Sequence, residues 1–198
     1  MNGHALHPLM AQAAAEAARI AHGVRAEQLD GPTPCTGFDT RALVGHWVLY
    51  TSHGLEHRAR REQLPQELTE RDFTADPAWA EGYAKQLDRA VAAWADPRAW
   101  EGEIDLGGGA VMPATAIARM LIAELLVHGW DVAAATGQRV EVTDELARLV
   151  LGLVEEFAEM FRQYDGFADP VAVPAAAPLF ERALAASGRD PRWAPAAG

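Results

Sequence analysis

The chain has 198 residues, of which 49% are hydrophobic, and its formal net charge is −11. This length and composition suit one globular domain, so we expect a single domain over residues 1–198. The negative charge argues against nucleic-acid binding, and without a long apolar run or a leader we expect a cytoplasmic protein that does not cross a membrane.

Helical periodicity dominates the first half of the chain. Apolar residues recur at three- and four-residue spacing over residues 5–29, which predicts a first amphipathic helix. Thr36 and Asp39 have the spacing of a capping box, which predicts that a second helix begins there and continues to about residue 61. Asp76-Pro77 then predicts the start of a third helix, because Asp is a common N-cap and Pro suits the first helical position.

The second half contains one short interruption of this helical pattern. Between residues 100 and 112 apolar and acidic residues alternate before a glycine-rich turn, which predicts a small β-hairpin. A fourth long helix is predicted from Pro113 to Thr136, and a further helical stripe follows Thr143. A short helical piece is expected over residues 180–186. These elements predict an α-helical bundle with a minor β element.

Three metal-ligating residue types lie on the apolar stripes of the second and fourth helices. Glu124 and His128 are one turn apart on the fourth helix, and His46 lies between Leu43 and Trp47 on the second. All three are expected to face the core, where a carboxylate needs a partner that compensates its charge. Two histidines and a carboxylate with an open fourth position form a ligand set of catalytic zinc. The alternative is a pair of structural core histidines.

Tyr50, His53 and His57 follow His46 on roughly the same helical face. From their helical face alone they would line the approach to the metal, and either histidine could be an extra ligand. A place at a pocket mouth or in solvent is the favoured interpretation of the two histidines.

Two further residues have roles that the pattern leaves open. Cys35 lies close to a helix start, where a thiol pKa is lowered, although a packed loop thiol is the favoured interpretation. Asp131 follows His128 by three residues, so it could accept a hydrogen bond from that imidazole or hold the neighbouring loop.

Three segments resemble a known superfamily, in its order and over nearly the whole chain. They are PTPCTGFDTRALVGHWV (residues 32–48), AELLVHGWDVAAATGQ (123–138) and GRDPRW (188–193). Together they resemble the actinobacterial metal-binding branch of the DinB / mycothiol-dependent maleylpyruvate isomerase-like superfamily. The resemblance implies an all-α fold, a DinB-like up-and-down four-helix bundle with a small β-hairpin and a short C-terminal helical extension. It also places the ligands of a divalent metal at His46, Glu124 and His128.

The resemblance implies an enzyme that uses the metal and a low-molecular-weight thiol such as mycothiol. Tyr50, His53 and His57 would then lie along the approach of that thiol cofactor. We expect a transferase or isomerase acting on a small electrophilic molecule, with zinc as the favoured ion and nickel or iron as alternatives. The isomerase itself carries a further C-terminal domain, so the substrate stays open. The alternative is a non-catalytic stress protein that binds a metal or a small ligand. A monomer or a homodimer is expected, with a small molecule or thiol as the partner.

Overall fold

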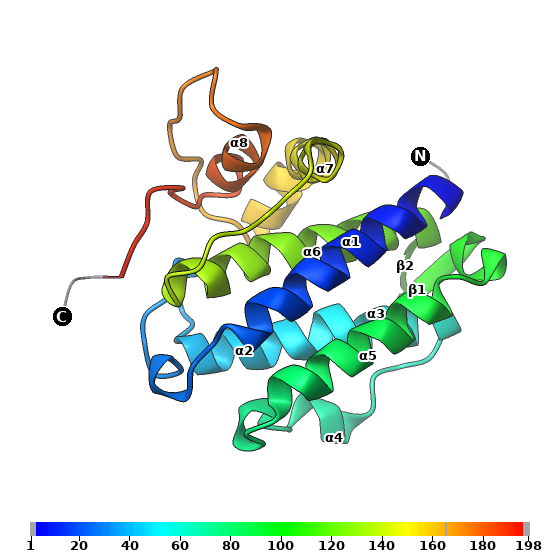
Figure 1. Ribbon diagram of the computed structural model, residues 1–198. Coiled ribbons are helices and arrows are strands. Elements are labelled where there is room, and N and C mark those ends of the chain that lie inside the picture. The colour runs from blue at the N-terminus through cyan, green and yellow to red at the C-terminus, as the bar shows by residue number, and fades with distance from the viewer. Residues whose placement is uncertain (1–2, 165, 196–198) are drawn as a thin grey trace.

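The computed structural model describes residues 3–164 and 166–195, and most of them are helical (Figure 1). The helices are α1 (Gly3–His22), α2 (Thr40–Val48), α3 (Gly54–Arg60), α4 (Gln66–Thr69), α5 (Trp79–Ala93), α6 (Ala114–Ala135), α7 (Asp144–Gln163) and α8 (Leu179–Ala186). Strands β1 (Glu103–Gly107) and β2 (Ala110–Pro113) form an antiparallel hairpin in which Ile104 pairs with Met112. The predicted helical bundle and hairpin are thus confirmed.

Four long rods form the bundle: α1, the continuous α2–α3 segment, α5 and α6 (Figure 1). α1 and α5 are antiparallel, because His7 donates to the carbonyl of Val91 (2.9 Å) while His22 lies 3.4 Å from Glu81. The connection between α3 and α5 crosses back along the bundle and contains α4. As a result α2–α3 and α5 run parallel, and the helix directions do not alternate strictly along the chain.

Local capping signals explain where the bundle helices begin and end. α6 follows Pro113 and ends before Gly137, whose φ of +72° is a left-handed conformation that suits glycine. α2 begins at Asp39, whose carboxylate accepts from the N–H of Ala42 (2.8 Å). The predicted capping box that opened at Thr36 is therefore wrong, because Asp39 itself is the N-cap.

The first helix is shorter than the apolar pattern predicted. α1 ends at His22, directly before Gly23, and a short 3₁₀ turn, η1 (Ala26–Gln28), follows it. The apolar residues beyond His22 therefore continue to pack without continuing the helix.

Large aromatic side chains fill the core where the rods meet. The indole of Trp47 is fully buried and donates to the carbonyl of Leu125 (3.2 Å), which ties α2 to α6. The indole of Trp94 donates to the carbonyl of Leu55 (2.9 Å). Because both indole N–H groups are satisfied, burial of these rings is strongly stabilising, and truncating either one to Ala would cost about 3–5 kcal/mol.

A π-helical turn, η2 (Leu49–His53), interrupts the rod between α2 and α3. The N–H of Gly54 donates to the carbonyl of Leu49, five residues earlier, while Thr51 and Ser52 donate their hydroxyl protons to the carbonyls of Trp47 and Val48 (both 2.6 Å). This wide turn adds about one residue, so the residues after it are rotated by roughly 100° relative to an uninterrupted α-helix.

The C-terminal part of the chain packs on the outside of the bundle. α7 and α8 lie together on the side of α6, and the segment after α8 returns toward α6 (Figure 1). α7 begins at Thr143, whose hydroxyl accepts from the N–H of Leu146. Within the described ranges, no helix combines the length and the apolarity that a membrane span requires.

Candidate metal centre

His46, Glu124 and His128 converge at the interface of α2 and α6. The Nε2 atom of His128 lies 3.3 Å from Oε2 of Glu124, and Nε2 of His46 lies 3.9 Å from the same oxygen. One ligand atom from each residue lies within 4.8 Å of the others. The two α6 residues meet because they are one helical turn apart, and the packing of Trp47 against α6 brings His46 to them.

The sequence predicted that these three side chains face the core. In the structure they line a cavity and are partly exposed. The side chains of His46 and Glu124 are 30% and 34% exposed, and that of His128 is 12% exposed. The cavity measures 510 Å³ and lies between the bundle and the C-terminal segment. Phe38, Phe161 and Phe167 form apolar parts of its wall, and Cys35 and Arg189 add a thiol and a cation. A small molecule can therefore reach the three donors.

Asp131 orients the His128 imidazole from the side opposite to Glu124. The carboxylate of Asp131 is fully buried and accepts the Nδ1–H of His128 at 3.0 Å. A neutral His128 with its proton on Nδ1 keeps the lone pair on Nε2, which points toward Glu124. This is the carboxylate–histidine arrangement that fixes the tautomer of metal-ligating histidines.

Arg189 neutralises the buried Asp131. Its Nε and Nη2 atoms donate to the Asp131 carboxylate at 2.8–3.0 Å, and Nη1 donates to the hydroxyl of Ser187 (3.2 Å). Arg189 follows Gly188, whose φ is +88° and where an added Cβ would lie 2.6 Å from Cβ of Ala168. Arg189 was not among the residues predicted to form the site, although the GRDPRW segment that contains it contributed to the resemblance.

Cys35 lies beside this pair, with its sulfur 3.8 Å from Nη2 of Arg189. Cys35, His128 and Asp131 also bring ligand atoms within 4.8 Å of one another. However, a cation bound there would share the Asp131 carboxylate with the guanidinium of Arg189 and would be repelled by it. The set of His46, Glu124 and His128 therefore suits a divalent metal better.

The charges of Glu124 and His128 depend on each other. Burial alone would raise the pKa of Glu124, but the neighbouring His128 and His46 outweigh it and hold that pKa well below its ordinary value. Burial alone would lower the pKa of His128, but Glu124 and Asp131 hold it well above 6.5. The metal-free site therefore holds a proton on His128, in the position that a cation would take.

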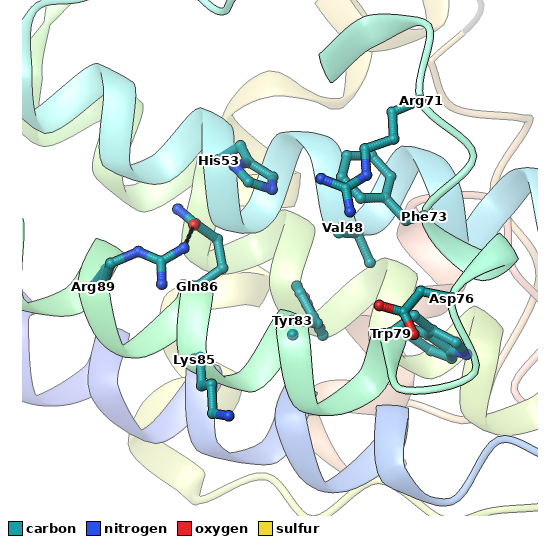
Figure 2. Close-up of a pocket in the computed structure, with 11 residues that line it drawn as sticks. Val48, His53, Arg71, Phe73, Asp76, Trp79, Tyr83, Lys85, Gln86 and Arg89 are labelled. Atoms are coloured by element: carbon teal, nitrogen blue, oxygen red, sulfur yellow. Dashed lines mark hydrogen bonds between the residues drawn. The ribbon is translucent and has the colours of Figure 1, made fainter. Parts of the chain in front are cut away.

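Tyr50, His53 and His57 were expected to line the approach to the metal, and only Tyr50 lies next to a proposed ligand. The ring of Tyr50 packs against His46, with ring centroids 4.7 Å apart. His53 stacks on Phe73 (5.4 Å) and lines another cavity (Figure 2), while Nδ1 of His57 lies 3.4 Å from Glu62. His53 and His57 are not brought to the metal site, because the π turn rotates them away from the face of His46.

The sequence profile of the mycothiol maleylpyruvate isomerase N-terminal domain matches residues 10–133, a range that contains all three donors. The chain belongs to this family. Two proteins of similar sequence are uncharacterized proteins of Mycobacterium tuberculosis, MT0763 of strain CDC 1551 / Oshkosh and Rv0738 of strain ATCC 25618 / H37Rv. Each is 34% identical to this chain over 198 residues, covering 94% of this chain and 100% of the relative.

The fold of this family member also resembles solved structures. The crystal structures of the mycothiol-dependent maleylpyruvate isomerase and of a mutant of it match with TM-scores of 0.58 and 0.59. The match covers 78% of this chain and 70% of the isomerase chain at 14% sequence identity, so it supports the shared fold.

Proposed function

We propose that this protein binds a divalent metal through His46, Glu124 and His128 and uses it with a low-molecular-weight thiol. The observation that carries the proposal is the meeting of two imidazole nitrogens and one carboxylate at the wall of an accessible cavity. This donor set suits zinc, with nickel and iron as alternatives. When bound, such a metal lowers the pKa of a coordinated thiol, so that the thiol reacts as a thiolate near neutral pH.

The surrounding residues suit this chemistry. Asp131 holds the His128 imidazole with Nε2 directed toward Glu124, and Arg189 compensates the charge of Asp131. Phe38, Phe161 and Phe167 limit the water that reaches the site, which favours reaction of an electrophile with the thiol over hydrolysis. We propose mycothiol as the thiol, because the family profile and the matching crystal structures carry that name. The reaction class is transfer or isomerisation of a small electrophilic molecule.

Metal analysis and thiol titration test this proposal together. The untagged protein is analysed for bound metal by mass spectrometry, and mycothiol is titrated into metal-loaded and chelator-treated samples by calorimetry. We expect one metal per chain and thiol binding only to the metal-loaded sample. Tight metal binding without thiol affinity would instead support a non-catalytic metal-binding protein.

Two variants test the assignment of His46 as a metal ligand. His46→Ala is expected to remove both the metal and the thiol affinity, because it deletes one of the three donors. His22→Ala is the matched control, since His22 lies on α1 with its side chain 48% exposed, and it should leave both unchanged. Equal metal content in the two variants would reject the assignment.

A further inference from the structure

A second cavity lies on another side of the α2–α3 rod, between the π turn and α5 (Figure 2). It measures 250 Å³, and none of the residues that line it also lines the cavity at His46, Glu124 and His128. His53, which the π turn rotates away from His46, forms part of its wall. The cavity is therefore independent of the proposed metal chemistry.

The floor of this second cavity is aromatic. Phe73 and Tyr83 are 7% and 1% exposed, and Trp79 lies beside them. The His53 ring stacks on Phe73 with an angle of 25° between the ring planes. The hydroxyl of Tyr83 is hydrogen-bonded to Thr51 at 2.6 Å, so the floor contains no unsatisfied phenol. Such a surface favours a planar, apolar ligand.

The rim of this cavity is positively charged although the chain as a whole is acidic. Arg71, Lys85 and Arg89 line it, against a single lining carboxylate, Asp76. Asp76 accepts from the N–H of Ala78 (2.8 Å) and so has a local role at the start of α5.

The three cations are held differently. Lys85 is paired with Glu81 (3.1 Å), and Arg89 donates to the side-chain oxygen of Gln86. The guanidinium of Arg71 lies over the Phe73 ring, 5.4 Å from its centroid, and Figure 2 shows it directed toward the middle of the cavity. Arg71 and Arg89 can therefore both turn toward an anion at the opening.

The titration of His53 reports the same positive environment. Its pKa is lowered to about 4, first by burial and then by the charges of His57, Arg89 and Arg71, which outweigh the opposing charge of Glu56. His53 is therefore neutral at pH 7 and has one ring N–H to donate. A neutral stacked imidazole beside two guanidinium groups offers donors to an anion without adding charge to the apolar floor.

We propose that this cavity binds a small aromatic carboxylate, with its ring among the aromatic side chains that line the cavity and its carboxylate toward Arg71 and Arg89. The volume of 250 Å³ suits a molecule with one ring. A carboxylate on a ring uses both the floor and the rim, whereas inorganic phosphate would use the rim alone.

Titration with benzoate tests the proposal on the full chain. NMR spectra that resolve the His53 imidazole follow benzoate, benzamide and inorganic phosphate in parallel. We expect saturable shifts of the His53 resonances with benzoate, and binding of benzamide and phosphate at least about tenfold weaker, because each lacks one of the two contacts. Equal affinity for phosphate, or benzoate shifts that bypass His53, would overturn the proposal.

Charge-removing variants separate this cavity from the metal site. Arg71→Gln combined with Arg89→Gln is expected to weaken benzoate binding about tenfold or more. Both side chains are exposed, so the melting temperature should stay close to that of the unaltered chain. Arg148→Gln, an exposed substitution on α7, is the matched control, and His46→Ala should also retain benzoate binding. Loss of benzoate binding in His46→Ala, or its retention in the double variant, would place the ligand elsewhere.

Discussion

The guanidinium of Arg189 donates to both carboxylate oxygens of Asp131, a residue on α6 that is completely buried. The same carboxylate accepts the Nδ1–H of His128, so a residue near the end of the described chain is linked to a proposed metal ligand through one intermediate side chain. The C-terminal segment therefore helps to position the His128 imidazole through Asp131.

Replacing Arg189 should destabilise the protein strongly. Arg189→Met leaves the buried carboxylate of Asp131 without its cation, and breaking such a pair typically costs about 3–5 kcal/mol. Urea unfolding measures the loss in the free energy of unfolding. Arg192→Met is the control, because the side chain of Arg192 is 80% exposed and its pair with Asp190 should contribute little to stability. Similar losses in both variants would contradict a buried pair.

Asp131→Asn should weaken metal binding while leaving all three proposed ligands in place. The amide keeps the size of Asp131 but accepts a weaker hydrogen bond from His128, and loss of a partner that orients a ligand typically costs about 10–100-fold in metal affinity. His128→Ala should reduce the affinity further, by orders of magnitude, since a ligand itself is removed. Competition with a fluorescent zinc chelator measures both. Unchanged affinity in His128→Ala would reject the ligand assignment.

The stability that a bound metal supplies should fall with decreasing pH. The metal requires an unprotonated Nε2 on both histidines and an ionised Glu124, whereas the unfolded chain takes up protons on its histidines below about pH 6.5. In that range the unfolded state therefore binds more protons than the metal-bound state, and stability rises with pH. Melting temperatures from pH 8 to pH 5, with zinc and with chelator, should converge toward pH 5. Superimposed series at every pH would exclude linkage of a metal to folding.

His53 predicts a separate pH dependence that persists in the presence of chelator. Its pKa is about 4 in the folded protein and 6.5 in the reference state. Between these values His53 binds a proton in the unfolded chain but not in the folded protein. The contribution of His53 to the free energy of unfolding is therefore largest above pH 6.5 and declines as the pH falls toward 4. His53→Gln should flatten this part of the stability profile, whereas His22→Gln, on the exposed end of α1, should leave it intact. Identical profiles for His53→Gln and the unaltered chain would contradict a neutral, partly buried His53.

Much of the fold could be predicted because its signals are local. Pro113 and Gly137 bound α6 to within one residue of the prediction, and α7 follows Thr143 as its apolar stripe predicted. The meeting of His46 with Glu124 and His128 followed from helical periodicity, because each lies on the side of its helix that packs against the other.

The remaining features depend on distant contacts. The π turn at residues 49–53 is stabilised by bonds to backbone carbonyls and by Tyr83 on α5, and helical periodicity cannot reveal an added residue. The pairing of Asp131 with Arg189 joins residues 58 positions apart, so no local sequence pattern could predict it. The single-domain organisation, the binding of a metal and the identity of that metal stay predictions.

The π turn also has a consequence for comparing members of this family. Because η2 contains an added residue, one rod presents His46 to one cavity and His53 to another. A relative that lacks the added residue would need a one-residue gap in the alignment near positions 49–53. Without that gap, the residue aligned with His53 would be the one that faces the His46 side of the helix, so a histidine at that position would line a different cavity in the two kinds of relative.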